Sequence, residues 1–207
     1  MKPLRLLPYL LVLVFCVVAP VAASAQLAQA VPVDSATARA ALLASAKQYP
    51  TFYRAVREVQ QQDTLLKRLV LVRNGRNDGP AAAFPNGAVR LDVRYLQSPQ
   101  PGFDDNRMVV VFYHEIGHLH YFRTMPQAQR TPDASERAAF DYSLQATRRL
   151  AEAGDCGPLQ AGLHFMLLRS QSNDVADPHV RALKNLVQEP AYAEYRRYVA
   201  RHCPARP

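Results

Sequence analysis

Beyond residue 25 the sequence contains no apolar run that approaches the ~20 residues needed to span a membrane. It also lacks any block of consecutive basic residues, although the formal net charge of the chain is +8. Nucleic-acid sites usually have such a block, so we expect no nucleic-acid partner. The excess of cations is instead compatible with an anionic envelope component or an acidic substrate.

Residues 1–25 have the pattern of a secretory signal peptide. Two cations precede an apolar run over residues 10–21, and Ala23-Ser24-Ala25 forms a small-x-small cleavage site. An uncleaved membrane anchor is the alternative, although the apolar run is short for a full span. We therefore expect an exported protein, periplasmic or secreted. Its mature part should be one domain over residues 26–207, with no stable membrane span once the signal is removed.

Cysteine is scarce, with three residues in the whole chain. Cys16 falls within the predicted signal peptide, where the preceding Phe15 argues against a lipoprotein site. Cys156 and Cys203 remain after cleavage, and an even number in an oxidising compartment favours a disulfide between them. Two buried free thiols are the alternative. The sequence contains no Cys-x-x-Cys motif, so neither thiol is expected to be a nucleophile.

The hydrophobic pattern predicts a mostly helical α+β fold. Capping residues and prolines bound expected helices at residues 34–49, 52–68, 104–124, 132–153, 158–169, 178–188 and 191–202. A polar stretch at residues 60–63 marks a break in the second of these helices. Extended chain is expected at residues 69–72 and on both sides of Asn86-Gly87, which is a strong hairpin signal.

The second half of this hairpin alternates in polarity. Its apolar positions are Val89, Leu91 and Val93, and its polar positions are Arg90, Asp92 and Arg94. The alternation predicts one buried and one wet face. Pro85 favours an edge position, because proline cannot donate to a neighbouring strand. An edge strand can pair with an extended peptide substrate through backbone hydrogen bonds, and a purely structural hairpin is the alternative.

The stretch from His114 to His118 has the form His-Glu-x-x-His in the middle of an expected helix that is apolar almost all round. On a helix, His114 and His118 lie one turn apart on one face, the spacing that lets two imidazoles share one Zn²⁺. Glu115 lies about 100° further round, where it can meet an attacking water without being a ligand. Buried imidazoles need a partner, and a metal ion supplies one. Ordinary hydrogen-bonded helix residues are the alternative.

A third ligand must come from elsewhere in the chain. The longer motif with a third histidine is absent, because Tyr121 and Thr124 occupy the corresponding positions. His120 lies about 200° round the helix from His114, on the wrong face for the same metal. Glu136, near the start of the next predicted helix, is the candidate that would complete a His₂Glu site.

Two alternatives to Glu136 as the third ligand remain open. Asp133-x-x-Glu136 resembles a capping box, in which Glu136 would only accept a hydrogen bond from a backbone N–H at the helix start. Asp141 lies about 140° round the helix from Glu136, so the two cannot readily face one metal. Asp141 is therefore either the ligand itself or a group that orients an imidazole from outside the ligand shell.

The motif helix and the Glu136 segment together resemble the gluzincin branch of the zinc metallopeptidases. Within it, the layout is similar to small soluble relatives of the prenyl-protease-like (CAAX-type) family. Residues 83–89 are similar to the hairpin before the motif helix of that family, and residues 136–139 to its Glu-x-x-Ala stretch. In the family an aspartate follows that alanine directly, whereas here Phe140 precedes Asp141.

The resemblance implies a compact α+β zincin, mostly helical, with a small sheet or hairpin packed on the motif helix. It implies zinc on His114, His118 and Glu136, and Glu115 as the general base in hydrolysis of a peptide or protein substrate. A non-catalytic secreted protein, with a structural zinc site or a basic binding surface, is the alternative. Candidates for a transition-state donor, each with a packing or surface role as the alternative, are Tyr142, His164 and His179.

Overall fold

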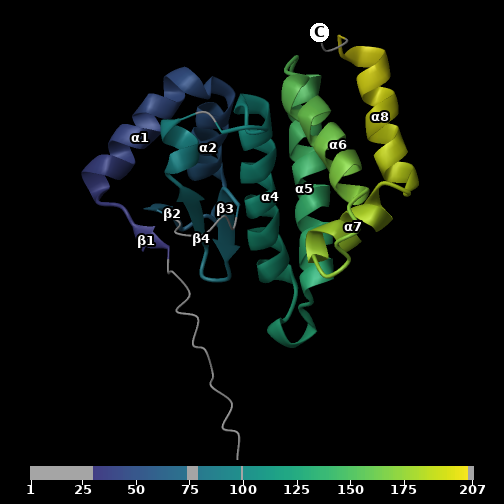
Figure 1. The fold of residues 1–207 in the computed structure, drawn as a ribbon, viewed down its shortest axis with the longest axis horizontal. Helices are drawn as coiled ribbons and strands as arrows, with labels where there is room; N and C mark the ends of the chain where they lie inside the picture. The colour runs from purple at the N-terminus through teal and green to yellow at the C-terminus, as the bar shows by residue number, and fades with distance from the viewer. Residues whose placement is uncertain (1–29, 74–78, 99, 205–207) are drawn as a thin grey trace, which may run out of the picture.

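The computed structural model describes residues 30–73, 79–98 and 100–204, and Figure 1 shows their arrangement. The predicted signal peptide, including Cys16, lies outside these residues. Helices dominate, and a small mixed sheet accompanies them, which confirms the expected α+β class. Of the described helices, none combines the length and the hydropathy that a membrane crossing requires.

The bounds of most predicted elements are close to the predicted ones. The helices are α1 (Ser35–Gln48), α2 (Pro50–Gln62), α3 (Arg94–Gln97), α4 (Asp105–Thr124), α5 (Pro132–Glu152), α6 (Gly157–Ser170), α7 (Pro178–Leu186) and α8 (Pro190–His202), with a 3₁₀ turn η1 (Gln127–Gln129). The strands are β1 (Val31–Pro32), β2 (Arg68–Arg73), β3 (Ala81–Phe84) and β4 (Ala88–Asp92). Helix α2 is shorter, and the short α3 and β1 were not predicted. Asp34, Asp104 and Asp177 cap α1, α4 and α7, each accepting a hydrogen bond from a backbone N–H of the first turn.

Helix α2 is shorter at its C-terminal end than predicted. It ends at Gln62 rather than near residue 68, because the polar stretch expected as a break is its C-terminus. There the Asp63 carboxylate accepts a hydrogen bond from the backbone N–H of Leu65 (2.7 Å) and lies 2.8 Å from Nε2 of His120 on α4. These contacts favour a turn over another helical turn, and the chain continues into β2.

The sheet has the strand order β1-β2-β4-β3, with β2 and β4 parallel and the other neighbours antiparallel. The predicted hairpin joins β3 to β4, so β3 is an edge strand of the described sheet. The turn contains Gly87 at φ +80°, a conformation that favours glycine. The prediction of a wet face is wrong at Asp92, which is 2% exposed. Its carboxylate accepts hydrogen bonds from the backbone N–H (3.0 Å) and the Nη2 (2.5 Å) of Arg94, so the charge is paired where it is buried.

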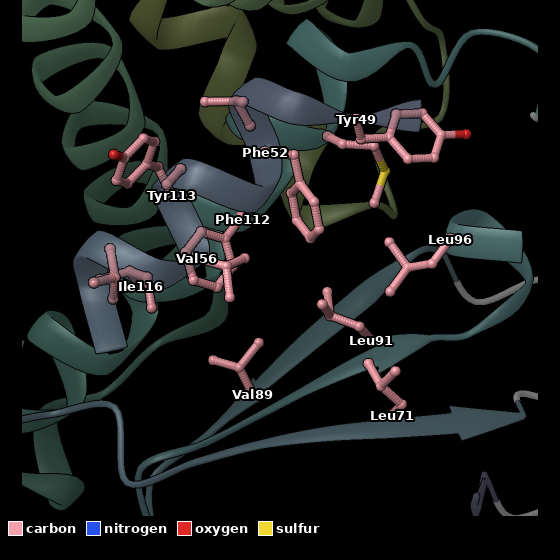
Figure 2. Close-up of a cluster of buried hydrophobic side chains, with 14 of the residues drawn as sticks. Tyr49, Phe52, Val56, Leu71, Val89, Leu91, Leu96, Phe112, Tyr113 and Ile116 are labelled. Carbon is pink, nitrogen blue, oxygen red and sulfur yellow. The ribbon is translucent and has the colours of Figure 1, made fainter. Parts of the chain in front are cut away.

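Helix α4 is the centre of the molecule. Figure 1 shows it between the sheet with α1 and α2 on one side and the helices α5 to α8 on the other. In Figure 2, Phe52 of α2 and Phe112 of α4 lie above Val89 and Leu91 of β4, and the two phenyl rings meet edge to face with centroids 5.9 Å apart. A second buried cluster, which includes Leu144 of α5, fills the space between α5, α6, α7 and α8. Because both sides of α4 are covered, its sequence is apolar almost all round.

A disulfide joins Cys156, which precedes α6, to Cys203, which follows α8. The two Cα atoms are 5.8 Å apart. Within the loop that the disulfide closes, the hydroxyl of Tyr192 on α8 donates a hydrogen bond to the carbonyl of Leu163 on α6 (2.6 Å). The crosslink therefore holds the C-terminal helices together as one unit.

Helices α4 and α5 approach each other closely at Gly117. A Cβ at this position would lie 2.7 Å from the Cα of Ala139 and 2.8 Å from the Cβ of Tyr142. Backbone cannot move aside as the end of a flexible side chain can, so only glycine allows this approach. The close contact fixes the first turns of α5 against the middle of α4.

We predict that Gly117→Ala lowers the free energy of unfolding by about 1–3 kcal/mol, because the new methyl group collides with the α5 backbone. Urea denaturation measures the change. Gly162→Ala is the matched control, since Gly162 also lies in a helix and faces α4, but its Cβ would lie 3.3 Å from a movable methyl group of Val110. Equal effects of the two substitutions would contradict the close contact at Gly117.

Candidate metal centre

Three side chains from two helices converge where α4 faces the first turns of α5. His114 and His118 of α4 have 7% and 8% of their surface exposed, and Glu136 of α5 has 12% of its side chain exposed. Nε2 of His114 lies 3.1 Å from Nε2 of His118 and 3.1 Å from Oε2 of Glu136. Nε2 of His118 lies 3.6 Å from Oε1 of Glu136. All three side chains can therefore offer one ligand atom to the same ion.

The spacing of these atoms fits a tetrahedral metal site. Two ligands with bonds of 2.0–2.1 Å to one tetrahedral ion are about 3.3–3.4 Å apart. Nε2 of His114 lies 3.1 Å from both Nε2 of His118 and Oε2 of Glu136, slightly less than that value, and one ligand atom from each of the three residues lies within 4.8 Å of the other two. Two imidazoles and one carboxylate form a donor set that suits divalent transition metals and leaves one tetrahedral position open.

The electrostatics of the cluster favour neutral imidazoles. Burial, and secondly the neighbouring His114, lower the pKa of His118 to about 3 against the opposing effect of Glu136. Burial, with smaller contributions from His179 and Arg107, places the pKa of His114 well below its ordinary value. Metal binding requires a neutral imidazole, so these ligands are ready to bind at neutral pH.

Ser135 orients one of the imidazoles, a role that the sequence did not indicate. Its Oγ lies 2.8 Å from Nδ1 of His118. If Nδ1 carries the proton and donates it to Ser135, Nε2 keeps its lone pair for a metal. The prediction had offered Asp141 for such a role, but Asp141 accepts a hydrogen bond from Nη2 of Arg137 (3.2 Å). The sequence offers one weak sign of this contact, a small hydroxyl residue directly before the candidate ligand Glu136.

The capping-box alternative for Glu136 is wrong. Thr131 caps α5, because its hydroxyl accepts a hydrogen bond from the backbone N–H of Ala134 (3.3 Å). Asp133 is turned toward Arg181 of α7, whose guanidinium donates to it at 2.5–3.1 Å. The start of α5 is therefore satisfied without Glu136, whose carboxylate faces the two imidazoles.

His179, at the start of α7, is next to the cluster. Its Nε2 lies 3.1 Å from Oε2 of Glu136, and its Nδ1 lies 2.9 Å from Oδ1 of Asp177. Asp177 also accepts hydrogen bonds from the backbone N–H of His179 and from Arg169, so the carboxylate is held on three sides. His179 does not belong to the set of three metal-compatible residues. It instead presents Nε2 beside them, with its orientation set by Asp177.

Glu115 points to the other side of the cluster, toward the edge strand. It is 7% exposed, and its carboxylate accepts a hydrogen bond from the backbone N–H of Ala83 on β3. Burial, and secondly the nearby Glu136, raise the pKa of Glu115 to about 8. Glu115, His118, Glu136 and His179 together line a cleft of about 520 Å³ whose wall is β3.

The other candidates lie away from this cleft. His120 pairs with Asp63 and stacks on Tyr142, with ring centroids 4.7 Å apart, in a separate hollow on another face of α4. His164 is on α6 and lines a third hollow beside Arg107. Of the three predicted donor candidates, the structure brings only His179 to the cluster.

Comparison with known proteins finds no family model, curated protein or solved structure that matches the chain. The family resemblance seen in the residues therefore stays a prediction. Two features of the three side chains favour metal binding: the short distances between them, and donor atoms that are neutral or anionic.

We predict that Glu115→Gln stabilises the metal-free protein increasingly as pH rises from 4.5 to 8. The folded protein keeps a proton on Glu115 up to about pH 8, while the unfolded chain releases it near pH 4.5. Wild-type stability therefore falls as pH rises between these values, and glutamine removes that loss. The expected gain at pH 8 is about 2–4 kcal/mol, measured by urea denaturation with a chelator present. Glu194→Gln, at an exposed position, is the control and should give no such trend.

Proposed function

We propose that the protein is an exported zinc metallopeptidase that cleaves a peptide bond held over the His114, His118 and Glu136 cluster. The observation that carries this proposal is the convergence of those three ligands beside an edge strand, with the buried Glu115 between them. Neither feature alone points to hydrolysis of peptides. Together they support a reaction in which a metal, a base and a backbone-pairing surface act in one cleft.

Zinc is the metal that suits the donor set best, because it favours four-coordinate sites with histidine and carboxylate ligands. When bound, Zn²⁺ supplies Lewis-acid chemistry, lowering the pKa of an attacking water and polarising the substrate carbonyl. The cation also favours ionised Glu115, since a positive charge opposes the effect of burial on the pKa of that carboxyl.

Glu115 is the proposed general base. As a carboxylate it takes the proton of the attacking water and then passes it to the leaving amine. Its hydrogen bond from the N–H of Ala83 fixes the carboxyl group against β3, beside the path of the substrate.

His179 is the proposed donor to the oxyanion that develops on the substrate carbonyl. Asp177 lies against its Nδ1 and thereby leaves Nε2 directed at the cluster. A histidine donates to a developing oxyanion from a ring nitrogen that carries a proton, and Nε2 is the ring nitrogen that faces the cluster. This pairing supports His179 over His164 and Tyr142, which lie outside the cleft.

The substrate is proposed to lie along β3 in extended form. This strand has a neighbour, β4, on one side only in the described sheet. The N–H of Ala83 reaches Glu115 and therefore points into the cleft rather than toward β4. A peptide can add to such an edge by backbone hydrogen bonds, which holds the chain without requiring one particular side chain.

The alternative of a structural zinc site needs a closed shell of four ligands. His120 and His164, which could each supply an imidazole as a fourth ligand, lie in other hollows. His179 stacks on His114 with ring centroids 5.8 Å apart, but its Nδ1 is held by Asp177 and it is not among the three metal-compatible residues. The arrangement of the described residues thus favours an open site.

We predict about one zinc ion per chain in the purified protein, with the roles of the two glutamates separable. Glu115→Gln should keep the metal and abolish peptide hydrolysis. Glu136→Ala should weaken zinc binding by more than about 100-fold, which exceeds the usual effect of a residue outside the ligand shell. Elemental analysis and competition with a zinc indicator measure both. Glu194→Ala is the control, and a Glu136→Ala protein with full zinc affinity would remove Glu136 from the site.

We predict that His179→Gln lowers kcat by about 10²–10³-fold while zinc affinity and KM change little, because the lost group acts on the transition state. Steady-state cleavage of a fluorogenic peptide gives both constants. His164→Gln changes a histidine outside the cleft and should leave them unaltered. Loss of zinc in His179→Gln would instead make His179 a ligand.

A further inference from the structure

A second hollow, which we call the basic hollow, lies beside the cleft at the metal centre. It has a volume of about 710 Å³ and lies between the β3–β4 turn, the end of α4 and Lys67. Phe122 and Arg130 line both spaces, so the two are neighbours. The ring of Phe122 stacks on His118 at 6.0 Å, and the Arg130 guanidinium lies 5.3 Å from the centre of that ring. Phe122 therefore forms the wall between the metal ligands and the basic hollow.

The charge of this hollow is of one sign. Three cations, Lys67, Arg123 and Arg130, line it, and in the described part of the chain no carboxylate does. Arg130 donates hydrogen bonds to the carbonyls of Phe122 (2.5 Å) and Met125 (3.0 Å) at the end of α4, which fixes its guanidinium. Lys67 and Arg123 are exposed side chains that form no ion pair with the described residues. An anion entering the hollow thus meets cations that are not already neutralised.

Lys67 is positioned by the hairpin turn. Its backbone N–H donates a hydrogen bond to the carbonyl of Gly87 (2.8 Å). A Cβ at Gly87 would lie 2.6 Å from Cγ of Lys67, so the side chain of Lys67 passes directly over the glycine. The turn thus places this cation just beyond the end of β3.

We propose that the basic hollow binds an acidic side chain of the substrate, so that the protein prefers peptides with Asp or Glu about three or four residues from the cleaved bond. This inference rests on the proposed peptidase function. A chain that follows β3 from Glu115 advances about 3.3 Å per residue and passes the turn after about three or four residues. Its carboxylate there lies within reach of Lys67 and Arg123. A peptide fits better than other polyanions, because the hollow is the continuation of an edge strand.

Binding tests the inference independently of catalysis. The probes are a fluorescein-labelled dodecapeptide of alternating Ala and Glu, and its counterpart with Gln in place of Glu. Fluorescence anisotropy with zinc-loaded Glu115→Gln protein should show about tenfold tighter binding of the Glu peptide at low salt, with the difference shrinking at high salt. The same measurement on metal-free protein should give the same preference, because the cations do not depend on the metal. Equal affinities for the two peptides would overturn the inference.

Charge reversal identifies the residues. Lys67→Glu with Arg123→Glu should remove the preference for the Glu peptide, while affinity for the Gln peptide stays within about twofold. The matched control is Arg39→Glu with Lys47→Glu, which changes the net charge equally at exposed positions of α1 that line neither space. If the control variant lost the preference as fully as the test variant, the preference would depend on net charge alone. That result would overturn the assignment of Lys67 and Arg123.

Cleavage of a randomised peptide library by the wild-type protein distinguishes the proposed peptidase function from the proposed acidic preference. Products enriched about tenfold in Asp and Glu over Asn and Gln, at one position three or four residues from the new terminus, support both. Cleavage without such enrichment overturns the acidic preference and keeps the peptidase function. Preferential binding of the Glu peptide without any cleavage overturns the peptidase function and keeps the basic hollow as an acidic-peptide site.

Discussion

The constraint that shapes this protein is the burial of ionisable side chains on a helix that other elements cover on both sides. Helix α4 lies between the sheet and the C-terminal helices, yet it carries His114, Glu115 and His118 on its buried surface. Burying such groups without partners is costly, and each has one: a hydroxyl, a carboxylate, the other imidazole or a backbone N–H. The depressed pKa values of the imidazoles and the raised pKa of Glu115 have burial as their first cause. The chemistry of the centre is therefore a consequence of how the core is built.

The contact that makes this burial possible is the one between α4 and α5. Gly117 lies between His114 and His118 in the sequence. Because it has no side chain, the backbone of α5 can pack directly against α4 at this position. That approach brings Ser135 to one imidazole and Glu136 to both. The residue between the ligands thus matters as much for packing as the ligands do for binding.

Much of this arrangement follows from local rules that the sequence displays. Helix caps, proline starts and the Asn86-Gly87 turn act over a few residues, and the elements they bound are close to those predicted. The i, i+4 spacing places His114 and His118 together on any helix. The parallel pairing of β2 with β4 and the contact of Ser135 with His118 depend on chain segments far apart or on the angle between helices. Asp92 was predicted to be exposed but is buried, because Arg94, two residues away, pairs with it. The alternation of polarity does not reveal such a pair.

The disulfide divides the centre into two parts with different dependence on redox conditions. The loop between Cys156 and Cys203 contains α6, α7 and α8, and so contains Asp177 and His179. The three ligands and Glu115 lie outside that loop, on α4 and α5. Crosslinking restricts only the segment that it closes. Within the proposed site, the crosslink therefore acts on the segment that carries His179, and the three candidate ligands and Glu115 lie outside its direct influence.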